Sequence, residues 1–352
     1  MTKLIIIMAG LFWLTLFNTY AGRGELSRFT LLHDRILVDR ELREINHNHF
    51  LQIDLMASSG LLDLFNDISN ISDSNESSLQ KRLDTLAILG RNVNTEKTID
   101  LLVSAGIPLP TLSIAGKEFY SSLLYDFHAG VMISVNNEAD PVNPVAQTYV
   151  RKQIKRGFST LFKAKKDQTY QVSLYQMLRS DTEARINATT LSTDGEFFNL
   201  DELNQDETTL NMDFLYHKHS SHGSWDLGIR ELKLYRFNDI RSLYGQSPLF
   251  HGRYTWFHRT HYFKIDPFVG FQHRKRYKIP RSLYGGFHLA LLNDSLPFTF
   301  TFKASNQFLT FMPQMRLKWF HFSYSFKNPF RNPQDDVWVS SLHNIQLDFP
   351  FP

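Results

Sequence analysis

The chain has 352 residues, enough for one large domain or two, and a formal net charge of +3. The near balance of charge excludes a nucleic-acid binder that works by bulk electrostatics. The absence of cysteine excludes disulfide scaffolds, thiolate metal sites and a cysteine nucleophile. Aromatic residues make up 14% of the chain although mean hydropathy is negative, so aromatic and polar residues must be interleaved. This composition is typical of a sheet with one face toward lipid and the other toward water.

The first residues predict an export signal. Lys3 supplies a positive start, Leu4 to Phe17 is apolar, and Thr19-Tyr20-Ala21 provides a small-x-small cleavage site. The apolar stretch is too short for a comfortable helical membrane span. We therefore predict a cleaved signal peptide over residues 1–21. Because no later segment is apolar enough for a membrane helix, any membrane form of this chain must be a β-barrel.

Residues 22–118 are predicted to be a mixed, partly helical segment that plugs or caps the rest. Ser77 to Gln80 resembles a capping box, and a helix is expected to run from there to Gly90. A second helix is expected from Thr95 to Ala105, ended by Gly106. The residues expected to face inward are Leu79, Leu83, Leu86 and Ala87 in the first helix, and Ile99, Leu102 and Val103 in the second.

From residue 119 to residue 352 the hydrophobic period changes from 3.6 to 2. Tyr125 to Val135 alternates with a polar set that includes Asp126 and His128, which we expect to face a lumen. Similar segments of about ten residues recur between turn signals, a length expected of tilted membrane strands. The prediction is an all-β, antiparallel membrane barrel of about 12 to 14 strands, with a partly helical N-terminal plug or cap. A soluble β-sandwich has the same alternation and stays open as an alternative.

The segment WFHFSYSF, residues 319–326, shows the alternation most clearly. The lipid-facing candidates share one parity and the lumen-facing candidates the other. Because Trp319 breaks the parity, we expect either a β-bulge between Trp319 and Phe320 or a lumen or girdle position for Trp319. The lipid-facing candidates are Phe320, Phe322, Tyr324 and Phe326; the lumen-facing candidates here are His321, Ser323 and Ser325; and the candidates for an interfacial aromatic girdle are Trp256, Trp319 and Trp338.

The layout resembles that of a known family. The segments that carry the resemblance are Gly60 to Ser69, Ser282 to Leu289, and the end of the chain from Pro297. In pattern and order they resemble fatty-acid-transporter-like outer-membrane proteins, and more closely the TraF-like plasmid-transfer branch. The resemblance implies a bacterial outer-membrane barrel that takes up a small solute, hydrophobic ones included. The Gly- and Ala-rich mature N-terminus and early Asn-Pro motif of fatty-acid transporters are missing, so no fatty-acid site is carried over.

The C-terminus predicts a partner. Ile345, Leu347, Phe349 and Phe351 alternate as in the closing strand that the outer-membrane assembly machinery recognises, although Pro350 and Pro352 depart from the pattern and could end the strand at Phe349. Membrane lipid is the other expected partner. The basic runs 152–156, 163–166 and 273–278 are interpreted as solvated strand ends and loops, with lipopolysaccharide phosphate binding as the alternative. The pattern does not determine an oligomeric state.

Two candidate chemistries are weighed and set aside. His217, His219 and His222 form the densest imidazole cluster, but no local carboxylate or cysteine completes a zinc or copper site. His321, Ser323 and Ser325 could suggest a lipase-like barrel, but residues two apart on a strand do not by themselves form a nucleophile and base pair. We therefore expect no enzyme activity, no cofactor and no metal. The leading function is passage of a small solute, and the alternatives are a structural component of an envelope or conjugation machine and a secreted soluble ligand-binding protein.

Overall fold

The computed structural model describes residues 24–43, 49–114, 116–136, 144–186, 206–242, 247–260, 263–275, 277–291, 298–332 and 337–350. The predicted signal peptide lies outside the described residues. Four helices are described: α2 (Gly24–Arg43), α3 (Leu61–Asp73), α4 (Ser78–Arg91) and α6 (Ile279–Ser282). Among the described residues, no helix is both long and apolar enough to cross a membrane.

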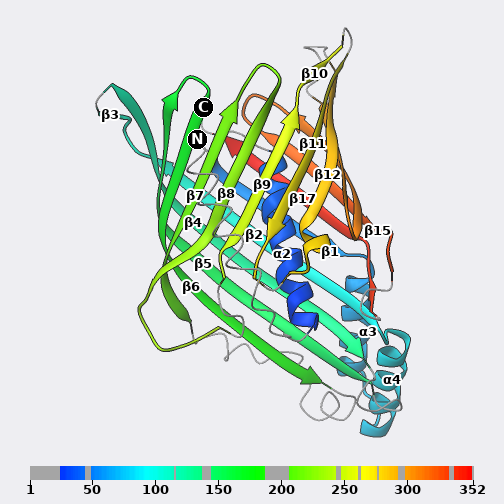
Figure 1. Ribbon diagram of the computed structural model, residues 1–352. Coiled ribbons are helices and arrows are strands. Elements are labelled where there is room, and N and C mark those ends of the chain that lie inside the picture. The colour runs from blue at the N-terminus through cyan, green and yellow to red at the C-terminus, as the bar shows by residue number, and fades with distance from the viewer. Residues whose placement is uncertain are drawn as a thin grey trace.

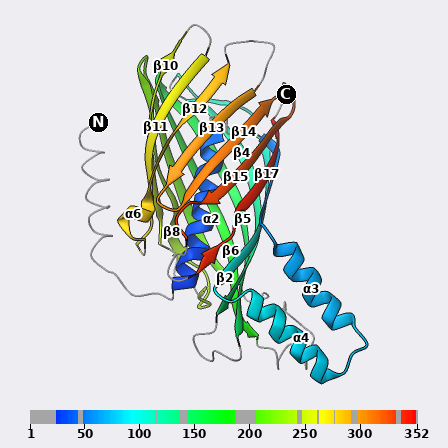
Figure 2. The ribbon, with the colours of Figure 1, turned by 90° about the vertical axis from the view of Figure 1, so that its right-hand side faces the viewer.

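All described strands belong to one sheet, which closes into a barrel (Figures 1 and 2). Three strands are short pieces: β3 (Leu112–Ile114), β10 (His258–Arg259) and β16 (Trp338–Val339). The other 14 close the barrel, because β1 pairs antiparallel with both β17 and β2. They are β1 (His49–Ser58), β2 (Thr95–Pro108), β4 (Lys117–Asn136), β5 (Val145–Lys165), β6 (Gln168–Ile186), β7 (Glu207–His219), β8 (Gly223–Arg236), β9 (Leu249–Trp256), β11 (Phe263–His273), β12 (Leu283–Leu291), β13 (Phe298–Ser305), β14 (Phe308–Arg316), β15 (His321–Pro329) and β17 (Leu342–Pro350).

This architecture confirms the predicted antiparallel barrel of 12 to 14 strands. The alternative of a β-sandwich is wrong, because a sandwich needs two packed sheets and the described strands form one closed sheet. The single parallel pairing among the described strands joins the short β16 to the start of β2.

The barrel is polar inside and apolar outside. Along β17, Asn344, Gln346 and Asp348 are buried, whereas Ile345 between them is exposed. The same alternation recurs around the wall, where buried positions include charged residues and exposed positions include Phe, Leu and Trp. A soluble barrel would show the reverse, because apolar side chains fill its core. The chain is therefore a β-barrel membrane protein, consistent with a bacterial outer membrane.

The predicted boundary between an N-terminal segment and a barrel at residues 118 and 119 is wrong. The barrel wall already includes β1 and β2, which pair with each other along their lengths. The expected helix from Thr95 to Ala105 is strand β2. Ile99, Leu102 and Val103 have helical spacing, but a strand can also accommodate them, with Leu102 facing inward among polar neighbours. Pairing with β1 and β4 on both sides decided between the two conformations.

Helices α3 and α4 form a hairpin between β1 and β2. The capping prediction is confirmed, since the Ser77 side chain accepts a hydrogen bond from the Gln80 backbone at the start of α4. The predicted inward stripe is wrong, because Leu79, Leu83 and Ala87 are exposed and Leu86 is half-buried. The residues of α3 and α4 that bury an apolar face against β4 and β5 are instead Leu61, Leu64, Ile68, Ile88 and Leu89. The hairpin lies beside the end of the barrel and not inside it (Figure 2).

The two ends of the barrel differ. At one, called here the C-terminal end, β17 finishes and His49 of β1 pairs with Pro350. At the other, called the α3–α4 end, Ser58 pairs with Leu342 and the hairpin follows. At the C-terminal end, residues 317–320 form a tight turn between β14 and β15, closed by a hydrogen bond between Leu317 and Phe320. The expected β-bulge at Trp319 is wrong, because Trp319 lies in this turn and not within a strand.

Candidate functional site: a plugged lumen

Helix α2 lies inside the barrel (Figures 1 and 2). Phe29, Leu32 and Ile36 have the spacing of one helical face, and each packs in a small apolar cluster with the wall. Charged residues occupy the other faces, and every residue from Arg28 to Asp39 except the half-buried Thr30 is buried. A helix charged on several faces can be buried only if its charges find partners, since an unpaired buried charge is costly. The wall supplies those partners.

Asp34 of α2 binds an arginine just beyond β11. Both carboxylate oxygens accept from the Arg274 guanidinium, at 2.6 and 2.7 Å, and the Tyr277 hydroxyl also donates to Asp34. Arg274 bridges onward to Glu231 of β8 at 2.9 Å. Burial raises the pKa of Tyr277, and the Asp34 carboxylate raises it further. Such a paired and hydrogen-bonded arginine fixes both the position and the orientation of the helix.

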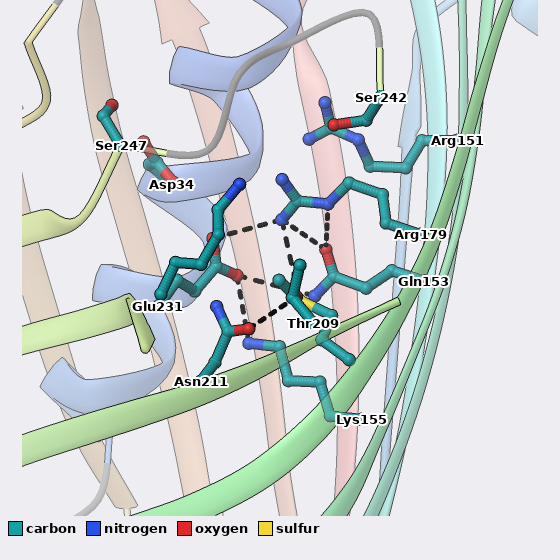
Figure 3. Close-up of polar contacts among 12 residues, drawn as sticks. Asp34, Arg151, Gln153, Lys155, Arg179, Thr209, Asn211, Glu231, Ser242 and Ser247 are labelled. Carbon is teal, nitrogen blue, oxygen red and sulfur yellow. Dashed lines mark hydrogen bonds and ion pairs between the residues drawn. The ribbon is translucent and has the colours of Figure 1, made fainter. Parts of the chain in front are cut away.

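Glu231 is the centre of a second group of charges in the lumen wall. Lys155 of β5 and Arg179 of β6 both approach it at 3.1 Å. Figure 3 shows these two side chains converging on Glu231 from the neighbouring strands, with Asp34 of α2 close by. Arg274 therefore connects the wall cluster to the plug helix through Glu231. This corrects the interpretation of the runs 152–156 and 273–278 as solvated, because Lys155 and Arg274 are buried in ion pairs. In the run 163–166, Lys163, Lys165 and Lys166 are exposed, as expected.

Asp39 of α2 pairs with two lysines of the opposite wall. Its two oxygens lie 2.5 Å from Lys303 Nζ of β13 and 2.7 Å from Lys327 Nζ of β15. Burial raises the pKa of Asp39, but the two ammonium groups lower it by more and hold it well below its ordinary range. Asp39 is thus ionised over the physiological range, and its charge joins two lysines that would otherwise repel each other.

Two arginines complete the attachment of α2. Arg28 Nε donates to Glu96 of β2 at 2.7 Å. Arg35 hydrogen-bonds Gln307 and Asn306 in the turn between β13 and β14, and its guanidinium lies 5.3 Å from the Phe308 ring. Since these partners come from widely separated strands, α2 is anchored around the circumference of the lumen.

His33 faces a third region of the wall. Its ring lies 4.1 Å from the ring of His128 in β4, centroid to centroid, and both residues are almost fully buried. His128 Nε2 is 2.6 Å from Asp100 Oδ2 of β2. Burial lowers the pKa of His33, and the nearby His128 and Arg151 lower it further. The His33 ring is therefore neutral.

At the C-terminal end, beyond these contacts, the structure has a small pocket that is open to solvent. Its lining comes from β14, β15 and β17 and includes His321 Nδ1 at 3.4 Å from Asp348 Oδ2. Ser323 Oγ has no hydrogen-bond partner among the described residues, so it is not bonded to His321 as a nucleophile would be to its base. The lining residues are Gln314, Arg316, His321, Phe322, Ser323, Gln346 and Asp348.

The residues predicted from alternation lie as follows. Ser323, Ser325 and His128 are buried, and Asp126 is half-buried and accepts a hydrogen bond from Ser104. Phe322, Tyr324 and Phe326 are half-buried on the opposite parity of β15, although Phe322 also borders the pocket. Phe320 precedes β15, and its ring lies 5.4 Å from the ring of Phe349, centroid to centroid, at a tilt of 47°.

The girdle candidates are all exposed and lie at strand ends. Trp256 closes β9 and Trp319 lies in the β14–β15 turn, both at the C-terminal end, whereas Trp338 lies in β16 at the α3–α4 end. In the histidine cluster, His217 pairs with Asp226 at 2.5 Å, while His219 and His222 are exposed. The carboxylate that the local sequence lacked thus comes from β8, and it also binds Arg253.

Sequence reasoning missed the anchoring residues of α2, above all His33, Asp34 and Asp39. A signal was present: apolar residues at helical spacing in a segment dense in both signs of charge. That pattern also describes an ordinary exposed helix, and only the closed barrel identifies it as a plug.

No protein-family model matches the chain, and a comparison with curated protein sequences finds no match. Among solved structures, CdiB from Acinetobacter baumannii is similar with 10% identity and a TM-score of 0.37, over 86% of this chain and 60% of that one. This chain thus spans about 60% of the length of CdiB. The transport unit of the autotransporter AIDA-I from Escherichia coli is similar with 7% identity and a TM-score of 0.41, over 95% of this chain and 100% of that one. A mutant of Rh. blastica porin has 6% identity and a TM-score of 0.35, over 86% and 99%. These similarities concern the β-barrel fold alone, and they identify no specific family.

Proposed function

We propose that this protein is an outer-membrane channel closed by its own helix α2, through which a small solute passes when α2 moves. The observation that carries the proposal is the lumen itself. Its wall is lined with charged and amide side chains, and α2 occupies it through ion pairs at Glu96, Arg274, Lys303 and Lys327. In outer-membrane barrels a polar lumen of this kind either forms a water-filled channel or is plugged, and here α2 is the plug.

The chemistry of the wall favours a hydrophilic solute. The buried positions of β14, β15 and β17 around the C-terminal pocket are mainly amide, hydroxyl and charged groups. An apolar solute would have to displace water from those groups without replacing their hydrogen bonds. The fatty-acid-transporter-like resemblance favours a hydrophobic solute instead. Measuring the uptake of a zwitterionic solute and of a fatty acid into liposomes distinguishes the two. We further propose export through a cleaved signal peptide, insertion by the outer-membrane assembly machinery, lipid contact at Phe322, Tyr324 and Phe326, and no catalytic activity.

Crosslinking tests whether α2 must move. The native chain has no cysteine, and Val38 of α2 packs in one cluster with Met312 of β14. A V38C/M312C double variant, bridged by a short thiol-specific reagent, should conduct no ions in a planar bilayer. Each single variant, treated with the same reagent, should conduct like the untreated protein. If the bridged and unbridged proteins conduct equally, α2 is not the gate. If neither form conducts under any condition, the alternative of a structural component in an envelope or conjugation machine is favoured.

A further inference from the structure

A buried cluster of two imidazoles and one carboxyl joins α2 to the barrel wall. His33 comes from α2, Asp100 from β2 and His128 from β4, and each is almost fully buried. One ligand-type atom from each of the three lies within 4.8 Å of the others. The cluster is formed only when α2 occupies the lumen, because one of its members lies on the helix and the other two on the wall.

The polar atoms of this cluster are incompletely satisfied. Neither ring nitrogen of His33 has a hydrogen-bond partner among the described residues, and neither does His128 Nδ1. A buried imidazole with both nitrogens unpaired costs free energy, so such a group calls for an explanation. His33 Nδ1 lies 3.9 Å from Asp100 Oδ2, beyond hydrogen-bond reach but within the distance that a shared ion would bridge.

Asp100 is a buried carboxyl with unusual partners. The groups that contact it in the described part of the chain are the two imidazoles, His128 at 2.6 Å and His33 at 3.9 Å. The nearby cations have carboxylates of their own: Arg151 pairs with Asp181 at 2.7 Å, and Lys155 with Glu231 at 3.1 Å. Buried carboxylates are normally paired with a cation or coordinate a metal, which leaves room for a metal cation at Asp100.

The wall also leaves space at the cluster. Gly130 pairs with Asp100 across β2 and β4, and a Cβ at Gly130 would lie 2.9 Å from Asp100 Oδ2 and 3.5 Å from His128 Nε2. Any other residue at this position would press the Asp100 carboxyl out of its present place, whereas 3.5 Å to the imidazole is ordinary contact. The glycine therefore leaves space beside Asp100 Oδ2 and His128 Nε2, the two ligand atoms that the wall supplies.

We propose that His33, Asp100 and His128 bind one divalent transition-metal ion, which fastens α2 to the barrel wall. Two imidazole nitrogens and one carboxylate oxygen suit Zn²⁺, which binds such ligands at about 2.0–2.2 Å. Ligands of a tetrahedral centre with those bonds lie roughly 3.4 Å apart, so shifts of less than about 1 Å bring the three atoms into place. The metal site stands independently of the proposed channel function, since binding is measured without any transport assay.

Zn²⁺ titration of the full-length, untagged protein in detergent, stripped beforehand with a chelator, tests the site by calorimetry. One equivalent should bind to the wild type, and Co²⁺ should give the visible absorption of a tetrahedral centre. D100N keeps the size of the side chain and one acceptor oxygen but removes the charge, and H33A removes one ligand. Both should weaken Zn²⁺ binding by more than about 100-fold, beyond the 10- to 100-fold typical of second-shell changes. The matched control is H219A/H222A, which removes two exposed histidines and should leave binding unchanged.

Whether the metal ion fastens α2 to the wall is measured separately, by thiol labelling. A single cysteine at Val38, buried on α2, should react with maleimide more slowly when Zn²⁺ is present, and H33A should abolish that protection. Heat-modifiable migration on gels shows that each variant still forms the barrel. The proposal is overturned if the wild type binds no Zn²⁺, if D100N and H33A bind it as tightly as the wild type, or if binding is lost only in the H219A/H222A control.

Discussion

Replacing Asp39 by asparagine should release α2 from the lumen. In the native protein the Asp39 carboxylate is 2.5 Å from Lys303 Nζ and 2.7 Å from Lys327 Nζ, and all three residues are buried. Asparagine keeps the size of the side chain but leaves two buried ammonium groups without a counter-charge. Breaking a buried ion pair on one side costs about 3–5 kcal/mol. We take about 3 kcal/mol, since water can enter the lumen as α2 leaves, and this corresponds to roughly a 100-fold rise in the undocked population.

Maleimide labelling of V38C measures that population, because Val38 is only 2% exposed while α2 is docked. In the D39N background the labelling rate should rise by about 100-fold, and the open probability in a planar bilayer should rise with it. The control is D239N, which removes the same charge at an exposed position after β8. Pairing D39N with K303M should recover part of the loss, since one of the unpaired ammonium groups is then gone. A rate in D39N within threefold of the control, with the barrel intact, would refute the claim that these ion pairs hold α2.

Three further predictions concern pH and the helical hairpin. The pKa of Asp39 is depressed in the docked state, so the carboxylate stabilises docking above its ordinary pKa of about 3.9. This stabilisation is lost as the pH falls toward the pKa of the docked state. The difference in labelling rate between wild type and D39N should therefore be constant from about pH 7 to 5 and shrink below about pH 4. L89A should leave a cavity where α4 packs on β4 and β5, which weakens docking of the hairpin by about 2–5 kcal/mol. Limited proteolysis should then cut α3–α4 more readily, while the barrel remains heat-modifiable. Unchanged proteolysis would contradict the packing. S77A should remove the α4 N-cap and destabilise the hairpin by only about 1 kcal/mol, seen as a smaller proteolysis effect than that of L89A; an equal effect would argue against the capping role.

The barrel strands were predictable to the extent that local alternation was clear. The 321–326 stretch alternates without interruption, and β15 begins at His321. The segment 95–105 was not predictable in the same way, because Leu102 faces inward beside Asp100 and Ser104 and so breaks the apolar–polar alternation. In α4, the Ser77 cap is a local hydrogen bond and was correctly identified. The buried face of α4 depends on where β4 and β5 lie, and it was assigned wrongly.

By itself, the sequence determined which side chains share a face, because successive residues of a strand point to opposite sides whatever the strand packs against. It also determined the polarity of those faces and, through Ser77, the start of a helix. Only the tertiary structure decided that the polar face encloses α2 and which charges meet there. Asp34 and Arg274 lie 240 residues apart, and Asp39 and Lys303 lie 264 apart. Contacts at such separations arise from closure of the barrel between β1 and β17, which local periodicity does not encode.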